Sequence, residues 1–84
     1  MVKTRRTSLD INRDILELCT IPQKRTHIVY KTNINFNLGF KYLNHLLDKE
    51  LIIQSGKFYE ITQKGIDTLN RLANVSNEIG LINV

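Results

Sequence analysis

Residues 33–35 form a very short break between two stretches whose apolar residues follow a helical period. The pattern predicts a short helix over about residues 26–32, with Thr26 as its N-cap. Asn33 suits the left-handed conformation of a tight turn, and Asn35 is a second N-cap that opens another helix. Two helices joined so closely must cross and pack against each other, which constrains the fold more than any other feature of this chain.

The helix that Asn35 opens is expected to run to about Lys49 and has two distinct faces. One face is apolar and predicted to be buried, and it carries Phe36, Gly39, Leu43, Leu46 and Leu47. The opposite face is polar and rich in amides, and it carries Asn37, Lys41, Asn44 and His45. Tyr42 is assigned to the core as well. In the preceding short helix, the residues expected to pack inward are Ile28, Val29 and Tyr30.

A first helix is predicted over residues 8–19, where apolar residues recur every three to four positions. Ser8 or Asp10 can cap its start, and Pro22 lies beyond its end. Residues 23–25 form a connector that is able to add a short strand to a later hairpin.

A β-hairpin and a last helix complete the predicted elements. Residues 51–54 and 58–61 are rich in β-branched and aromatic side chains, and residues 55–57 form a tight tip between them. Thr62 is expected to cap the last helix, in which Gly65 permits close packing.

These elements together predict an α+β fold that is mostly α: a winged helix-turn-helix with a three-helix core, a two-stranded β wing and a C-terminal helix. A length of 84 residues allows one compact domain. We expect a basic N-terminal tail over residues 1–7, the winged domain over 8–61 and the C-terminal helix over 62–84.

Basic charge is concentrated in two segments that contain no acidic residue. The chain has a net charge of +4. Residues 1–9 and residues 18–47 carry cations only, and these are Lys3, Arg5, Arg6, Lys24, Arg25, Lys31 and Lys41. Such segments focus a positive field toward a polyanion, so the placement of charge indicates nucleic-acid binding.

Other classes of function find no support in the sequence. Cys19 is the only cysteine and belongs to an apolar pattern, which indicates a buried hydrophobe. His27 and His45 lie outside any metal-ligand spacing, so neither a metal nor another cofactor is expected. No phosphate loop or nucleophile arrangement is present, which indicates that the protein is not an enzyme and has no evident small-molecule ligand. No stretch approaches the ~20 apolar residues that span a bilayer, so we expect a cytoplasmic protein without membrane association.

Several segments in combination resemble a known family. They are residues 26–31 with 34–37, residues 42–47 with 51–52, and residues 61–65. Over about residues 5–72 the chain is similar to the small archaeal winged-helix DNA-binding regulators. The resemblance implies double-stranded DNA as the partner, a role in transcription regulation and a homodimer formed through the C-terminal helix.

Two positions depart from that family's pattern. Gly39 stands where a larger apolar residue is usual, which weakens the helix by about 1 kcal/mol relative to Ala unless close packing needs the gap. Glu50 stands where a glycine is common, so the end of that helix is expected to lack the usual left-handed cap.

The expected DNA site has two parts. The second helix of such a motif enters the major groove, and the candidates for base contacts are Asn35, Asn37, Phe40, Lys41 and Asn44. Phosphate contacts need charge and reach, and the candidates are Arg5, Arg6, Lys24, Arg25, Thr26, Lys31 and Lys57. For Phe40 three roles stay open: contact with a thymine methyl group, packing under the wing, and part of a partner surface.

An apolar stripe on the last helix predicts the dimer interface. It consists of Ile66, Leu69, Leu72, Ala73, Ile79 and Ile82. The alternative is a last helix that folds back onto the first within a monomer. For function, the main alternative is a winged-helix module that binds protein and not DNA. RNA binding is a third, although the exposed aromatics that stack unpaired bases are scarce.

Overall fold

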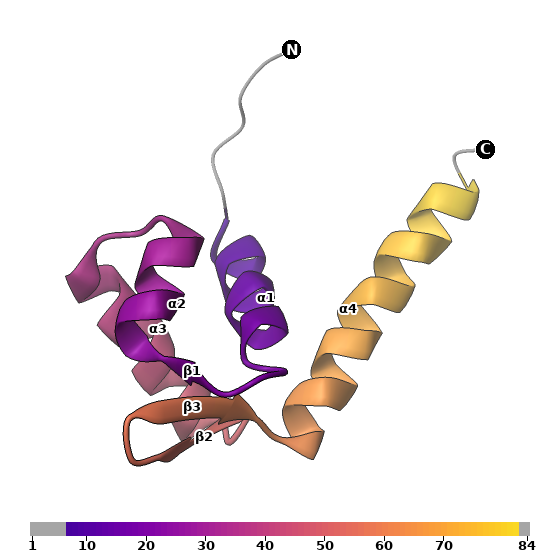
Figure 1. Ribbon diagram of the computed structural model, residues 1–84. Helices are drawn as coiled ribbons and strands as arrows, with labels where there is room; N and C mark the ends of the chain where they lie inside the picture. Colours follow the sequence, from indigo (N-terminus) through magenta and orange to yellow (C-terminus); the bar gives the residue numbers. More distant parts are fainter. Residues whose placement is uncertain (1–6, 83–84) are drawn as a thin grey trace.

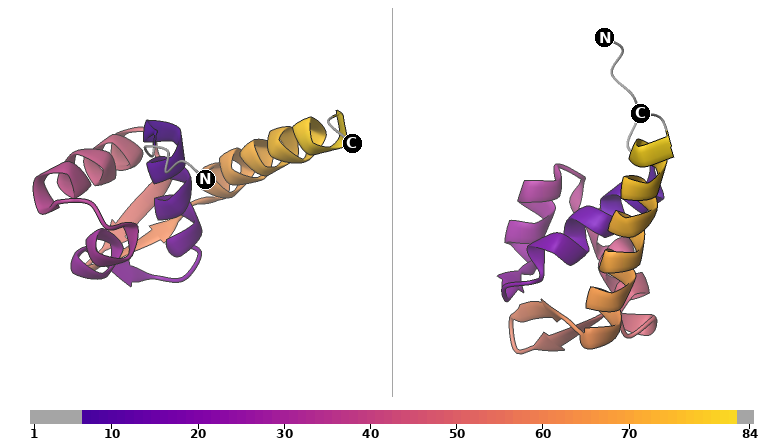
Figure 2. Two further views of the ribbon diagram at one scale, coloured as in Figure 1. Left: turned by 90° about the horizontal axis from the view of Figure 1, so that it is seen from above. Right: turned by 90° about the vertical axis from the view of Figure 1, so that its right-hand side faces the viewer.

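The computed structural model describes the backbone of residues 7–82 and the side chains of residues 7–72. Its elements are α1 (Ser8–Leu18), β1 (Gln23–Lys24), α2 (Arg25–Thr32), α3 (Phe36–Asp48), β2 (Ile52–Ser55), β3 (Phe58–Ile61) and α4 (Gln63–Ile82). Helices α1 to α3 gather beside a small antiparallel sheet, and α4 leaves that body and extends beyond it (Figures 1 and 2). The predicted class, a mostly helical winged helix-turn-helix, is confirmed.

The sheet has three strands in the order β1-β3-β2, so the connector before α2 does add a strand to the two predicted. The hairpin pairs Ile52 with Ile61 and Ser55 with Phe58, which leaves Gly56 and Lys57 as the tip. On the other edge, Lys24 of β1 lies opposite Phe58. This pairing brings the segment before α2 next to the tip of the wing.

One hydrophobic core holds the three helices and the sheet together. Each of these elements except β1 contributes a buried hydrophobic side chain, and the set is Ile11, Ile15, Leu16, Cys19, Ile28, Leu43, Leu46, Ile52 and Tyr59. Thr32 is the buried polar residue among the described side chains, and its hydroxyl donates to the Ile28 carbonyl at 2.7 Å. The core fixes α3 against α1, α2 and the wing.

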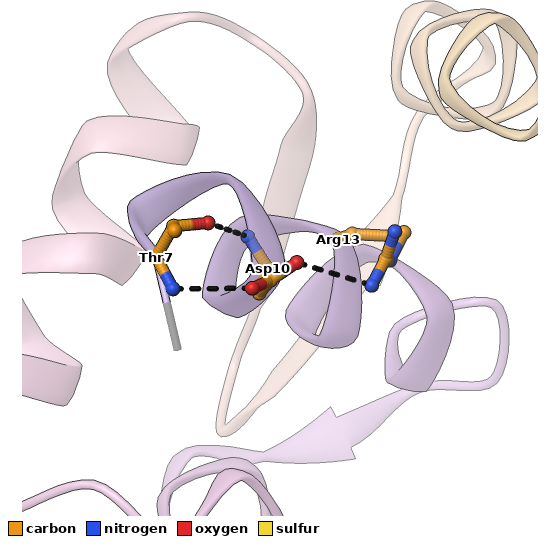
Figure 3. A network of polar contacts seen from close by, with 3 residues as sticks. All are labelled: Thr7, Asp10 and Arg13. Carbon is orange, nitrogen blue, oxygen red and sulfur yellow. Dashed lines mark hydrogen bonds and ion pairs between the residues drawn. The ribbon is translucent and has the colours of Figure 1, made fainter. Parts of the chain in front are cut away.

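Helix α1 begins at Ser8 as expected, but its N-cap is a different residue from those predicted. Thr7, rather than Ser8 or Asp10, is the N-cap, and its hydroxyl accepts from the Asp10 amide at 3.1 Å. The Asp10 carboxylate accepts in return from the Thr7 amide and forms an ion pair with Arg13 at 3.2 Å (Figure 3). This reciprocal capping box satisfies two amides at once, which neither of the predicted caps does alone.

Helix α2 corrects two expectations. It begins at Arg25 with Lys24 as N-cap and without a side-chain cap bond, so Thr26 does not cap it. The reason is that β1 pairs up to Lys24 and the chain passes directly from strand to helix. Tyr30 was expected inside but is 80% exposed, because the inward row of this short helix consists of Ile28 and Thr32.

The turn between α2 and α3 follows the prediction. Asn33 adopts the left-handed conformation at φ 58°, and Asn35 caps α3 by accepting from the Leu38 amide at 2.7 Å. The end of α3 differs from the prediction. Glu50 has φ 63° and supplies the left-handed cap that was expected to be missing because this residue is not glycine. Two Schellman bonds hold this conformation, from the Leu51 amide to the Leu46 carbonyl and from the Glu50 amide to the Leu47 carbonyl, both at 3.0 Å.

The start of α4 is anchored as predicted. The Thr62 hydroxyl accepts from the Gly65 amide at 3.0 Å and donates to the Glu50 carbonyl at 2.7 Å. Gly65 lies so close to β2 that a Cβ there would stand 2.2 Å from the Leu51 carbonyl oxygen. Close approach therefore requires glycine at this position.

Candidate nucleic-acid interface

The outward face of α3 presents the polar residues that the sequence singled out. Asn37, Lys41 and Asn44 are exposed, while Gly39, Leu43 and Leu46 form the buried row. The Asn35 side chain is already engaged as the cap of the helix. Phe36 was expected in the core but is 45% exposed, because the buried row begins at Gly39.

Gly39 sets the distance between the two helices of the motif. A Cβ at this position would stand 2.6 Å from Cγ2 of Val29 on α2. The close packing of the two helices therefore requires a residue without a side chain at position 39, which the sequence alone left unexplained. This packing offsets the loss of helix stability that glycine causes.

Four of the predicted phosphate contacts line one pocket between the start of α2 and the tip of the wing. The pocket measures about 320 Å³, and its lining is Lys24, Arg25, Thr26, Gln54, Gly56, Lys57 and Tyr59. The described residues that line this pocket include three cationic side chains and no carboxylate. Strand pairing between β1 and β3 brings the two parts together, although more than thirty positions separate Lys24 from Lys57 in the sequence.

The remaining phosphate candidates lie elsewhere. Lys31 lines a different pocket, with Asp14, Glu17, Leu18 and Thr32. Arg5 and Arg6 lie outside the described residues. The structure therefore brings together only part of the predicted set.

Arg25 also contacts α3, which sequence reasoning did not predict. Its guanidinium carbon lies 4.6 Å from the centroid of the Phe40 ring and 5.3 Å from that of Phe36. The two rings are tilted with their centroids 6.3 Å apart. The spacing of Phe36 and Phe40 by one helical turn is the signal that could have revealed the pair. We call Arg25, Phe36 and Phe40 the Arg–Phe cluster.

On its other flank α3 is tied to α1. The Tyr42 hydroxyl and the Ser8 hydroxyl lie 2.9 Å apart and share a hydrogen bond. Lys41 and His45 line a shallow pocket beside this contact. Contacts on both flanks thus fix the orientation of the polar face between them.

The described part of the chain offers little support for a reactive cysteine, a metal site or a membrane-spanning helix. Burial raises the pKa of the Cys19 thiol to about 12, so the thiol stays protonated at neutral pH and is a poor nucleophile. In the described part of the chain, whose side chains cover residues 7–72, no group of three or more His, Cys, Asp or Glu side chains could hold a metal ion. None of the helices there combines the length and hydropathy that crossing a membrane requires.

The residues of the predicted dimer stripe differ in their burial, and only some of their side chains are described. Ile66 is exposed, whereas Leu69 packs against the core and Leu72 is half-buried. The side chains of Ala73, Ile79 and Ile82 lie outside the described residues.

Comparison with known proteins places this geometry in a class. The sequence matches the winged helix-turn-helix family over residues 5–80, and the chain belongs to that family. A solved structure of wild-type ZitR from Lactococcus lactis is similar, with a TM-score of 0.69 and 25% sequence identity. The match covers 99% of this chain, which spans 65% of that ZitR chain. A search of curated protein sequences finds no match.

Proposed function

We propose that the protein is a transcriptional regulator that binds double-stranded DNA, with α3 in the major groove and the wing and the start of α2 on the phosphate backbone. The observation that carries this proposal is the convergence of Lys24, Arg25 and Lys57 in one pocket, beside a recognition helix whose outward face is polar. Action on chromosomal DNA would take place in the cytoplasm. The narrower likeness to archaeal regulators stays a prediction.

The pocket suits a phosphate group for two reasons. Its three cations attract an anion, and phosphate contacts require charge more than exact geometry. In addition, Lys24 gives α2 no side-chain cap, so the first amides of this helix stay available to an anion. A strand of DNA backbone seated there would lie next to α3, because Arg25 belongs both to the pocket and to the Arg–Phe cluster.

The face of α3 suits base edges. Asparagine can pair with adenine through two hydrogen bonds and lysine can donate to guanine, and both residue types occur here at exposed positions. The N-terminal half of a recognition helix is the part that meets bases, which favours Asn37, Phe40 and Lys41 over Asn44.

Single substitutions test this division of roles. Lys41→Ala and Asn37→Ala should change the order of preference within a panel of duplexes of different sequence, because base contacts specify. Lys57→Ala should weaken binding to all members similarly, by about three- to tenfold, because phosphate contacts position. Fluorescence anisotropy over the panel measures both effects. If Lys41→Ala leaves affinity and preference unchanged, α3 is not the element that reads the sequence.

The exposed rings of Phe36 and Phe40 support one alternative, a module that binds protein. Exposed aromatic side chains are enriched where proteins meet. In that case the chain would bind no duplex even at low salt, and the panel would separate the two functions.

We also propose a homodimer. One recognition helix reads only a few base pairs, and a two-fold dimer doubles this footprint. Helix α4 extends beyond the body (Figure 2). Ile66, near the start of this helix, is exposed. Because Leu69 is already used in the core, the dimer contact would rest on Ile66, Leu72 and the later positions of the stripe.

Leu72→Asp tests the dimer. A charge in a self-complementary apolar contact is costly, so the variant should sediment as a monomer at a concentration where the parent chain is a dimer. Asn70→Asp adds the same charge at an exposed position of α4 and should leave association intact. A parent chain that sediments as a monomer at micromolar concentration and still binds DNA normally would refute the dimer.

A further inference from the structure

Two aromatic rings stand at the edge of the proposed DNA-reading face. Phe36 and Phe40 are 45% and 41% exposed, although an interior position or a polar residue would avoid the cost of hydrated apolar surface. They occupy the N-terminal half of α3, the half that approaches base edges in a helix-turn-helix. The exposed surface of the two rings therefore lies where a bound ligand would cover it.

Arg25 holds these rings in place by stacking. Its guanidinium lies over both of them, and its Nε atom is buried without a hydrogen-bond partner among the described residues. Stacking rather than a network of hydrogen bonds thus orients the group. Rings that are fixed before binding lose less side-chain entropy when a ligand covers them.

The rings adjoin polar groups that suit the major groove. Phe36, Phe40 and Asn44 follow one another at intervals of four residues, so they form one row along α3. Lys41 is exposed beside that row. A ligand for this row must present an apolar group next to hydrogen-bonding groups.

The major groove of DNA offers one such arrangement. Its base edges consist of hydrogen-bond donors and acceptors, except for the 5-methyl group of thymine. In an A·T pair this methyl group lies in the same groove as the adenine edge, with which an asparagine can pair. An unpaired RNA base stacks on an open ring face, and here the guanidinium already occupies one face of each ring.

We propose that the Arg–Phe cluster recognises the 5-methyl group of a thymine in the major groove, with Phe36 and Phe40 in contact with the methyl group and Arg25 as their positioning residue. The proposal rests on the proposed function, because it needs α3 in the groove. It adds a preference for thymine at one or two positions of the binding site.

Replacing thymine with deoxyuridine removes the methyl group alone and tests the proposal. A site would first be enriched from a random-sequence duplex library, and each thymine in it would then be replaced in turn. Loss of one buried methyl group should weaken binding about fourfold at one or two positions. Phe40→Ala and Phe36→Ala should bind the thymine and deoxyuridine duplexes almost equally, while Tyr30→Ala, which removes an exposed ring elsewhere, should keep the fourfold difference.

The role of Arg25 has its own readout. Arg25→Lys retains the charge but not the planar stacking group, so the thymine preference should shrink more than overall affinity does. Circular dichroism verifies that each variant is folded, and Phe40→Leu, which keeps an apolar side chain, should retain part of the preference.

The outcomes separate this inference from the proposed function. Duplex binding with no deoxyuridine effect at any position, or a library that enriches no sequence, would overturn thymine recognition and leave DNA binding standing. A thymine preference that persists in both phenylalanine-to-alanine variants would also overturn it. Absence of duplex binding under all conditions would overturn both.

Discussion

A chain that carries Lys24→Ala and Lys57→Ala together is expected to bind a random-sequence duplex roughly 10- to 100-fold more weakly than the parent chain at ~0.1 M salt. Both ammonium groups line the pocket between α2 and the wing, so the double variant removes two of its three cations. Each lost phosphate contact also lowers the slope of log affinity against log salt by about 0.9, which gives a change of about 1.8 per chain. Anisotropy titrations at several salt concentrations measure both quantities.

A matched control separates the position of the charges from their number. Lys49→Ala with Lys64→Ala changes the net charge from +4 to +2, by the same two charges, at exposed positions outside the pocket. This control should lose only a few-fold in affinity. If both double variants lost affinity equally, the pocket would have no special part in binding.

Gly65→Ala is expected to lower the free energy of unfolding by about 3 kcal/mol and the midpoint of thermal unfolding by more than about 10 °C. The added Cβ would stand 2.2 Å from the Leu51 carbonyl oxygen and 2.6 Å from Cγ1 of Ile61. The first of these atoms belongs to the backbone that joins α3 to the wing, so it cannot move aside as a side-chain end can. Helix α4 would have to shift away from the sheet.

Gly56→Ala serves as the comparison for that substitution. This glycine at the wing tip has φ 61°, but a Cβ there would meet nothing within 4 Å. Its replacement should therefore cost only the strain of the left-handed conformation, about 1 kcal/mol. Thermal unfolding followed by circular dichroism compares the two, and an equal effect of both would contradict the steric explanation for Gly65.

Local sequence predicted most of the fold because the signals that define it act over a few residues. Asn33 and Asn35 mark the turn between α2 and α3 through their own backbone and side-chain preferences. The hairpin followed in the same way from two β-prone runs around a glycine-containing tip.

The differences arise where contacts distant in sequence decide. Glu50 adopts a left-handed conformation that is held in part by the distant Thr62 hydroxyl, which donates to the Glu50 carbonyl at 2.7 Å. Thr26 is not a cap because β1 pairs with β3 up to the residue before α2. Neither constraint is visible in the few residues around each position.

The candidate site shows the same division. Exposure of Asn37, Lys41 and Asn44 followed from helical periodicity. That Lys24 and Lys57 share a pocket depends on the pairing of β1 with β3, and the stacking of Arg25 depends on how α2 crosses α3. The helical pattern placed Phe36 in the core, because periodicity does not show how far along α3 the neighbouring elements cover that face.

Direct binding to duplex DNA at several salt concentrations is the measurement that bears most directly on the proposed function. A labelled random-sequence duplex, the corresponding single strand and a duplex RNA would be titrated with the parent chain between about 50 and 200 mM salt. We expect the DNA duplex to bind most tightly, with log affinity falling linearly against log salt at a slope between about −4 and −7, for roughly 4 to 8 phosphate contacts per dimer. A flat salt response, a preference for RNA or for the single strand, or no duplex binding at the lowest salt would contradict the assignment.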